Sequence, residues 1–378
     1  MTLKSSPPAG LQRFGKQIAP LLIVCALVFA LPLFLNNDFL LNKAARYIVL
    51  GILTMSLALS WGYGGILNLG QAMSFGIGSY AMAMALKLKT IPVHTGSGGL
   101  PDFMVWNNVE RLPWFWMPFR SLGFALAAGI IVPALVAAAL GWFVFRGRVT
   151  GVYVAIITLA TMVVLNLVII DQQSYTGGFN GITDLAQLEI FGIAFDAYGR
   201  ATYYLVAGCL TLSLLIGFAF TRSKAGLIIQ AIRDHEGRVR YFGYDVAAYQ
   251  IFVFALSAAI AGLAGMLYTV VMEFASPTFL GVQLSLSVVV WCAVGGRQSL
   301  VGAFLGAVLV AGMQGALSES AAFLETWTLV MGALFVLVVL FLPKGLAGFA
   351  QGTWRWLAQR RQVAQGLPQS REQTEGNA

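Results

Sequence analysis

The stretch Val246–Met272, VAAYQIFVFALSAAIAGLAGMLYTVVM, decides the fold class of this chain, because it carries no charged residue. About 20 apolar residues are enough for a helix to cross the hydrocarbon core of a bilayer. This segment is therefore long enough to span a membrane. Charge-free runs of comparable length recur along the chain, at residues 18–35, 48–86, 149–170, 201–221 and 326–343.

The composition agrees with a membrane protein, since 58% of the 378 residues are hydrophobic and only 10% are charged. A soluble domain carries about 25% charged residues. We predict an all-α, polytopic transmembrane helical bundle of about ten spans with broken or Gly-rich helices. The expected spans are 18–35, 44–61, 66–86, 121–145, 149–170, 202–220, 247–272, 282–295, 299–317 and 325–342. The spans 282–295 and 299–317 are separated at Gly295-Gly296, because adjacent glycines break a helix and Arg297 should reach water.

The basic residues predict the orientation. With the N-terminus in the cytoplasm, most of the 23 Lys and Arg residues fall on inner segments, as the positive-inside rule requires. We therefore expect both termini to be cytoplasmic and the first apolar run to be an uncleaved span. The expected layout is an N-terminal segment (1–17), a transmembrane domain (18–345) and a cytoplasmic tail (346–378) that is disordered at its end. Within the domain we expect outer loops at 88–120 and 171–201 and an inner loop at 221–246.

The sequence lacks the residue patterns that redox, metal, nucleotide-binding and catalytic sites require. The three cysteines lie in apolar runs without a CxxC pair, which indicates buried, unpaired thiols. The two histidines are far apart in sequence, and no GxxxxGK[ST] phosphate loop occurs. We expect no catalytic set, no metal, no cofactor and no nucleic-acid partner for this chain. Because no charge falls deep in an expected span, a neutral or zwitterionic solute suits it better than a proton or ion relay.

The inner loop gathers charges in the stretch KAGLIIQAIRDHEGRVRYFG (224–243). Ser223 can cap a short helix that begins at Lys224. Four apolar residues would share one face of this helix: Leu227, Ile228, Ala231 and Ile232. The helix either lies on anionic headgroups or docks on a protein partner. We favour docking, because Asp234 and Glu236 would be repelled by anionic lipid, whereas a protein surface can match both signs.

Polar side chains interrupt the Gly-rich stretch GYGGILNLGQAMSFGIGSYAMA (62–83). Irregular backbone at membrane depth needs cover from protein or a water-filled cavity. The glycines favour close helix packing, whereas Asn68, Gln71 and Ser74 are candidates for lining a solute path. Further path candidates are Thr158, Thr161, Asn166 and Gln314. A second break, GGRQSLVGAFLGAV (295–308), suggests internal repeats around a central site.

The first outer loop is rich in tryptophan. Trp106, Trp114 and Trp116 are either interfacial anchors, which we favour, or a docking face for an external partner.

Several blocks resemble one family, the integral membrane permease subunits of ABC importers for branched-chain amino acids and urea. The blocks are SWGYGGILNLGQAMSFGIGSY (60–80), GVYVAIITLA (151–160), TGGFNGIT (176–183), SKAGLIIQAIRDHEGRVRYFGYDV (223–246), AIAGLAGMLY (259–268), VGGRQSLVGAFLGAV (294–308) and LPKGLAG (342–348). They follow one another in order over nearly the whole chain. In such permeases the inner-loop segment docks on the ATPase. The resemblance assigns this coupling role to Gly226, Ala231, Ile232, Arg233, Asp234, Glu236 and Gly243.

The resemblance also implies a function and partners. The chain would form the transmembrane path of an importer in the bacterial inner membrane, with ATP and Mg bound on separate cytoplasmic ATPase subunits. A second, homologous permease subunit, forming a heterodimer, and an extracytoplasmic solute-binding protein would complete the assembly in the lipid bilayer. The outer-loop stretch LPDFMVWNNVERLPWFW (100–116) resembles urea-type permeases, so urea or a short amide is the first expectation.

Branched-chain amino acids are the alternative solute. They gain support from Phe179, which stands where urea-type permeases carry an amide, and from VVMEFASPTFLGV (270–282), which lacks their Asn-Pro-Ser stretch. An alternative of another class is a stand-alone secondary transporter or channel.

The topology is tested by tags at four positions. Tags at Gly96 and Gly178 should react with an impermeant reagent from outside, and tags at Gly237 and Ala378 only after the membrane is opened. A tag at Ala378 that reacts from the same side as one at Gly96 would exclude an even number of spans.

Overall fold

The protein is described by a computed structural model, which covers residues 9–35, 37–91 and 99–319 and the isolated positions 329, 332, 333, 336, 345, 346 and 348. The long helices are α1 (Ala9–Phe34), α2 (Asp38–Ala58), α3 (Gln71–Thr90), α5 (Leu122–Arg146), α6 (Val152–Asp171), α8 (Arg200–Arg222), α9 (Lys224–Tyr241), α10 (Val246–Met272), α11 (Val282–Gly295) and α12 (Leu300–Glu319). The short elements are η1 (Leu59–Tyr63), α4 (Asp102–Trp106), η2 (Met117–Arg120), α7 (Gln173–Thr176), η3 (Gly178–Asn180) and η4 (Pro277–Leu280). Two short strands, β1 (Leu188–Ile190) and β2 (Ile193–Phe195), form an antiparallel hairpin.

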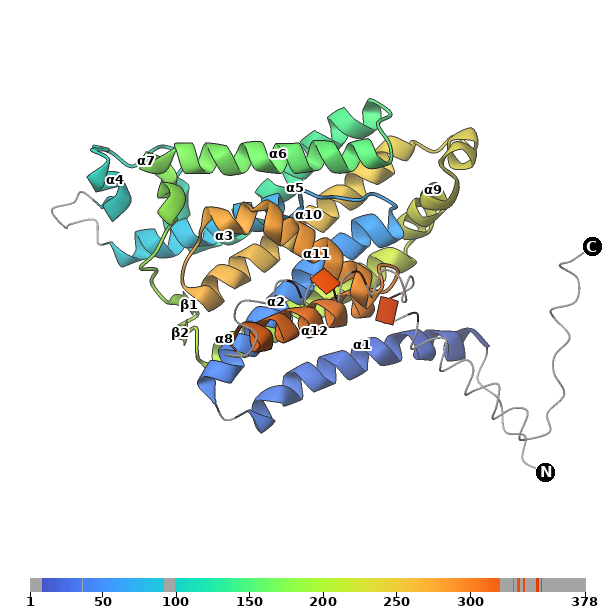
Figure 1. Ribbon diagram of the computed structural model, residues 1–378, viewed down its shortest axis with the longest axis horizontal. Coiled ribbons are helices and arrows are strands. Elements are labelled where there is room, and N and C mark those ends of the chain that lie inside the picture. Colours follow the sequence, from blue (N-terminus) through green and yellow to red (C-terminus); the bar gives the residue numbers. More distant parts are fainter. Residues whose placement is uncertain are drawn as a thin grey trace, which may run out of the picture.

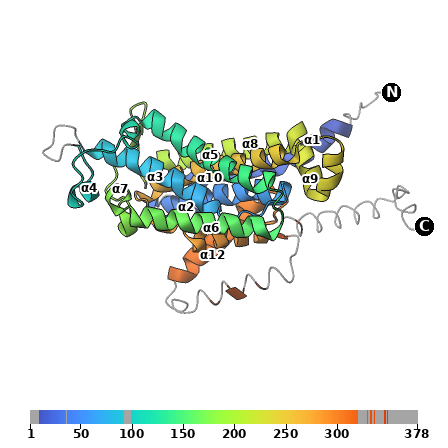
Figure 2. The same ribbon diagram turned by 90° about the horizontal axis from the view of Figure 1, so that it is seen from above.

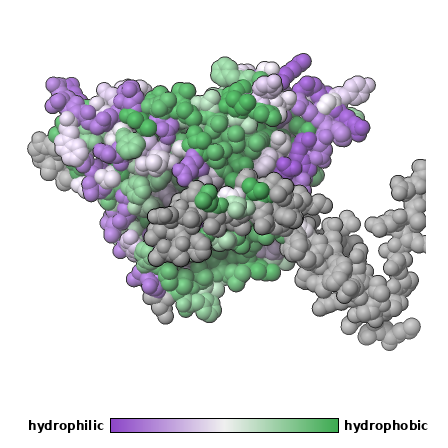
Figure 3. Space-filling view, viewed as in Figure 1, coloured by the Kyte–Doolittle hydropathy of each residue, from purple (hydrophilic) through white to green (hydrophobic). Residues whose placement is uncertain are grey.

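The long helices run along one direction and form a bundle (Figure 1). Helix α10 lies at its centre and contacts α5, α3 and α2, while α8 and α12 pack on α2. Seen from above, α2 and α10 lie in the middle of the molecule (Figure 2). The surface carries a hydrophobic region between two hydrophilic ends, one around α4 and one around α9 (Figure 3). This distribution is typical of a protein that crosses a bilayer with its two ends in water.

The all-α membrane fold is confirmed for the described residues. Six helices are long and apolar enough to cross a membrane: Asp38–Tyr63, Leu122–Arg146, Val152–Asp171, Arg200–Arg222, Val246–Met272 and Leu300–Glu319. Shorter apolar helices lie at Ala19–Phe34 and Val282–Gly295. Each expected span from 18–35 to 299–317 coincides with one of the long helices. The expected span 325–342 and the tail after residue 348 lie outside the described residues, apart from isolated positions.

Three helix starts differ most from the prediction, and one of them is that of α3, which begins at Gln71 rather than at 66. Helix α1 begins at Ala9, well before residue 18. Helix α2 begins at Asp38 rather than at 44, because the side chain of Asn37 accepts a hydrogen bond from the Phe39 amide at 3.0 Å and an acidic residue in the first turn favours the helix N-terminus.

Basic residues lie inside α2 and α3, and one of them, Arg46, already falls within the expected span 44–61. Lys43 and Arg46 lie on α2, and Lys87 is buried on α3. Two of them are neutralised by ion pairs: Lys43 with Glu319 at 2.5 Å and Lys87 with Asp102 at 2.7 Å. Lys43, Arg46 and Lys87 lie toward the α4 end of the bundle, and the expectation that no charge falls deep in a span stays a prediction.

The expected division of the 282–317 region is confirmed. Helix α11 ends at Gly295, Gly296 has a φ of +104°, and α12 begins at Leu300. Arg297 is exposed as expected, and its guanidinium lies 5.4 Å from the ring centroid of Trp61.

Small residues bring α3 and α10 into close contact. A Cβ atom on Gly265 would lie 1.8 Å from the Phe75 carbonyl oxygen, and one on Gly78 would lie 2.1 Å from the Gly262 carbonyl oxygen. Backbones approach this closely only where side chains are absent, which is how membrane helices pack in the absence of a hydrophobic driving force. The packing interpretation of the glycines therefore holds at Gly78.

The tryptophans of the outer loop divide into two kinds. Trp106 and Trp114 are exposed at 76% and 82%. Trp116 instead donates its indole N–H to the Tyr175 carbonyl at 3.0 Å and packs against Phe119. Trp116 therefore joins the outer loop to α7, and only the other two remain available as interfacial anchors.

The α3–α10 contact gives a stability prediction. Gly265→Ala should lower the free energy of unfolding in detergent by about 1–3 kcal/mol, because the added methyl group forces the two helices apart. Gly208→Ala is the matched control, since Gly208 lies in α8 with no atom within 4 Å of the new Cβ. Equal thermal midpoints for both variants and the unsubstituted protein would contradict the close packing.

Candidate functional site

The main irregularity in the bundle lies between α2 and α3. Helix α2 continues into the π-helical turn η1, and residues 64–70 then run without regular structure to α3. Backbone amides in this break have side-chain partners: Leu69 N–H donates to the Thr158 hydroxyl on α6 at 3.1 Å, and Gly70 N–H donates to the nearby Asn68 side chain at 2.9 Å. In the first turn of α3, Ala72 N–H donates to the Ser285 hydroxyl at 3.1 Å. The break is thus held by side chains from α6 and α11.

A buried polar network crosses the bundle beside this break. Gln71 donates to the hydroxyls of Ser56 at 2.7 Å and Ser257 at 3.1 Å, and it accepts from the Asn68 amide at 2.6 Å. Ser257 donates to the Ser56 carbonyl at 2.6 Å. All four residues are at most 3% exposed. The network therefore joins α2, the break and α10, and both side-chain amides have protein partners.

The predicted path residues fall into three places. Asn68, Gln71 and Thr158 belong to the buried surroundings of the break, and Ser74 is buried next to them on α3. Thr161 donates to Ile157 within α6, and Asn166 donates to the Pro277 carbonyl at 2.6 Å, where it holds η4. Gln314 alone of the seven lines the larger pocket described below. The role of these residues in a solute path stays a prediction.

The inner-loop stretch forms α9, and Ser223 caps it as expected, accepting from Gly226 N–H at 3.1 Å. The helix is longer than predicted, since it continues to Tyr241 through a kink at His235. Gly226 lies where a Cβ would be 2.1 Å from the Phe220 carbonyl oxygen, so α9 turns tightly against the end of α8. Gly243, with a φ of +86°, follows the helix and redirects the chain toward α10.

The buried face of α9 differs from the predicted one. Ile229 and Ile232 are buried, whereas Leu227 and Ala231 are exposed. The close contact at Gly226 fixes the rotation of the helix, so residues three and six positions later turn toward the bundle. As a result, Leu227 and Ala231 form an apolar edge that faces outward at i, i+4 spacing.

Arg233 points into the molecule and not outward. It donates to the Gly62 carbonyl at 2.7 Å and pairs with Asp234 at 2.9 Å. Glu236 pairs with Arg240 at 2.6 Å. Arg233 therefore connects α9 to the first break, whereas we had expected its charge at a partner interface.

The second break meets the first at this point. A Cβ on Gly62 would lie 1.7 Å from the Arg297 carbonyl oxygen, so only glycine allows η1 to touch the α11–α12 turn. A small cavity of about 160 Å³ lies beside the contact, and its lining includes Gly65, Thr150, Arg233, Glu236 and Gln250. Helix α9, the break that follows η1 and the α11–α12 turn thus meet at this end of the bundle.

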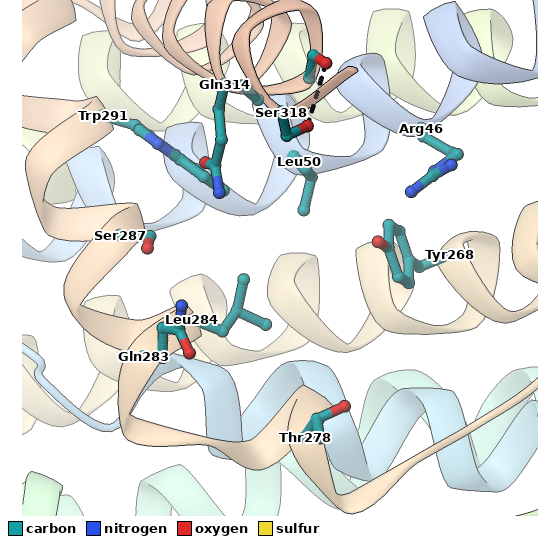
Figure 4. Close-up of a pocket in the computed structure, with 12 residues that line it drawn as sticks. Arg46, Leu50, Tyr268, Thr278, Gln283, Leu284, Ser287, Trp291, Gln314 and Ser318 are labelled. Carbon is teal, nitrogen blue, oxygen red and sulfur yellow. Dashed lines mark hydrogen bonds between the residues drawn. The ribbon is translucent and has the colours of Figure 1, made fainter. Parts of the chain in front are cut away.

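A larger pocket of about 360 Å³ lies toward the opposite end of the bundle (Figure 4). Its lining comes from five elements: Arg46 and Leu50 (α2), Tyr268 (α10), Thr278 (η4), Gln283, Leu284, Ser287 and Trp291 (α11), and Ala311, Gln314, Gly315 and Ser318 (α12). Arg46 and Tyr268 lie together on one side of it, and Trp291 and Gln314 on another. The pocket is of the size that proteins use for small-molecule ligands.

Few other side chains among the described residues are candidates for binding a metal or for reacting. Within 9–35, 37–91 and 99–319, no group of His, Cys, Asp and Glu could hold a metal ion, and Cys25, Cys209 and Cys292 are free thiols. Burial raises the pKa of Glu273, which follows α10 at the α4 end, and the nearby Asp196 raises it further.

Sequence reasoning missed two sets of residues. Ser56, Ser257 and Ser285 complete the polar surroundings of the break, and a lone serine in an apolar run was their only signal. Arg46 falls within the expected span 44–61, but it was not among the candidates for lining a solute path.

Comparison with known proteins identifies relatives. Residues 39–339 match the family model described as branched-chain amino acid transport system / permease component. The high-affinity branched-chain amino acid transport system permease protein LivM of Escherichia coli (strain K12) is 28% identical over 323 residues, covering 79% of this chain and 67% of that protein. The ribose import permease protein RbsC of Haemophilus influenzae is 24% identical, covering 50% of this chain and 58% of that protein. No solved structure gives a significant match.

These relatives bear on two expectations. They are named as permease proteins, so they are transport components and not enzymes, in agreement with the prediction that the chain catalyses no reaction. Urea or a short amide as the solute gains no support from them, and the alternative of branched-chain amino acids fits them better.

The polar network generates a prediction that separates structure from transport. Gln71→Leu should destabilise the protein by about 1–3 kcal/mol, because it leaves the Asn68 amide and two serines without their buried partner. The measurement is the thermal midpoint in detergent, with Gln314→Leu as the control that removes the same side chain outside the network. Unchanged stability together with lost uptake would instead indicate that Gln71 contacts solute.

Proposed function

The chain belongs to the family of permease components of branched-chain amino acid transport systems, and from this premise we propose that it forms a transmembrane path for branched-chain amino acids in an ATP-driven importer. ATP and Mg bind on separate cytoplasmic subunits, and the path is completed by a second, homologous permease in the bacterial inner membrane. An extracytoplasmic binding protein delivers the solute. In this assembly the α9 end of the bundle faces the ATPase and the α4 end faces outward.

One observation carries the coupling part of this proposal: Arg233 of α9 holds the Gly62 carbonyl at 2.7 Å, and Gly62 lies directly on the turn at Arg297. A displacement of α9 therefore acts on both helix breaks at once. Interrupted helices bend and rotate more easily than continuous ones, and they surround substrate sites in many transporters. ATP-dependent motion of a partner would reach the membrane region by this contact.

The surface of α9 suits a docking role. Leu227 is 60% exposed, and Ala231 lies one turn further on the same edge. Asp234 beside them is exposed as well, and the helix carries basic residues toward its end. An apolar edge bordered by charges of both signs matches a protein groove better than an anionic lipid surface.

The choice of solute rests on the relatives and on the pocket. Two of the relatives, from Escherichia coli and Methanocaldococcus jannaschii, are named for branched-chain amino acid transport. The 360 Å³ pocket combines apolar residues such as Leu50 and Leu284 with amide and hydroxyl groups. Such a mixture fits a solute that has a polar head and an apolar side chain.

The coupling proposal is tested by two substitutions that should fail in different ways. Ala231→Trp should prevent the ATP-binding subunits from copurifying with the permease, because the bulky ring occupies the docking edge. Arg233→Gln should leave that complex intact but lower leucine-stimulated ATP hydrolysis by about tenfold, because the link to Gly62 is lost. Both are measured on the assembled importer in nanodiscs.

The matched control is Ala194→Trp, which places the same ring on the exposed hairpin strand β2 at the opposite end. It should keep both the complex and hydrolysis. A complex that survives Ala231→Trp would contradict docking at α9. Leucine uptake by this chain without any ATPase would favour the stand-alone transporter.

A further inference from the structure

Arg46 is the only charged residue among those that line the 360 Å³ pocket in the described part of the chain. It lies eight residues into α2, which places it about 12 Å along the helix from Asp38. The side chain is half-buried, and a half-buried guanidinium favours an anionic or strongly polar partner, because an unpaired charge is costly to remove from water.

Two neighbouring lysines have carboxylate partners, whereas Arg46 has none among the described residues. Lys43, almost one turn earlier on α2, pairs with Glu319, and Lys87 on α3 pairs with Asp102. No Asp or Glu within residues 9–35, 37–91 and 99–319 lies within ion-pair distance of Arg46. Its neighbour is the phenol of Tyr268, beside which it faces the pocket (Figure 4).

The rest of the lining complements an amino acid. Hydroxyl and amide oxygens of Thr278, Gln283 and Gln314 can accept hydrogen bonds from an ammonium group. The ring of Tyr268 offers a π face to a cation. Leu50 and Leu284 supply an apolar wall. No lining residue in the described part carries a negative charge, so the one fixed charge of the pocket selects for an anion.

We propose that this pocket is a solute-binding site in which the Arg46 guanidinium binds the α-carboxylate of an apolar amino acid. The planar guanidinium can give two parallel hydrogen bonds to a carboxylate, a geometry that fixes orientation as well as charge. Urea has no charge for Arg46 to pair with, so the site discriminates against it. The inference rests on the proposed function, because it specifies how that path recognises its solute.

The test compares ligands that differ only in the carboxylate. Binding of L-leucine and of L-leucinol, which lacks the carboxylate, is measured by saturation-transfer NMR on the full chain in nanodiscs. The unsubstituted chain should bind leucine more tightly than leucinol. Arg46→Gln should weaken leucine binding by about ten- to a hundredfold and leave leucinol binding unchanged, because a charge-assisted hydrogen-bond pair is lost.

Controls separate recognition from folding. Arg46→Lys keeps the charge without the planar fork and should recover part of the leucine preference. Arg200→Gln removes an arginine that does not line the pocket and should change neither ligand's binding. The thermal midpoint of each variant shows whether Arg46→Gln remains folded, and leucinol binding provides a second, ligand-based check.

Two results would overturn the inference. Equal leucine binding in Arg46→Gln and the unsubstituted chain overturns the inference, as would be expected if Arg46 paired with a lipid phosphate instead. Absence of leucine binding to the unsubstituted chain overturns it too. The proposed function is judged separately, by leucine uptake into vesicles that hold the assembled importer, and such uptake with an unselective Arg46 would leave that function standing.

Discussion

The architecture depends on satisfying the backbone at one interruption of the helical bundle, between η1 and α3. Between η1 and α3 the chain leaves helical geometry, and in a bilayer every freed amide and carbonyl must be paired within the protein. The side chains of Thr158, Asn68 and Ser285 accept hydrogen bonds from the amides of Leu69, Gly70 and Ala72. Gln71 joins the break to serines on α2 and α10. The same bonds tie α2, α3, α6 and α10 together, so the interruption organises the centre of the bundle.

This interruption also determines how the α9 end is built. Because η1 carries Gly62, its backbone reaches the turn at Arg297 and leaves a carbonyl for Arg233. The tight turn at Gly226 orients α9 so that Arg233 faces inward and Leu227 faces outward. One short helix thereby joins an outward apolar edge to the two places where the bundle is least regular. The contacts of Arg233 with Gly62 and of Gly62 with the turn at Arg297 connect α9 with these two places.

The opposite end has a different electrostatic character. Ion pairs neutralise Lys43 and Lys87, whereas Arg46 faces a pocket of hydroxyl, amide and apolar groups. The two ends thus differ: α9 presents an outward apolar edge, and the pocket near Arg46 combines one cation with hydroxyl, amide and apolar groups.

The sequence by itself determined the membrane class, the helix positions, the Ser223 cap and the division at Gly295-Gly296, because charge-free length and glycine pairs act locally. It also singled out Asn68, Gln71 and Arg233, since polar residues are conspicuous in an apolar chain. Their partners were decided only by the tertiary structure: hydrogen bonds from Gln71 to Ser257 or from Arg233 to Gly62 join residues far apart in sequence. The rotation of α9 and the pocket at Arg46 likewise follow from how helices approach one another, and a backbone contact such as that at Gly226 leaves no periodic pattern in the sequence.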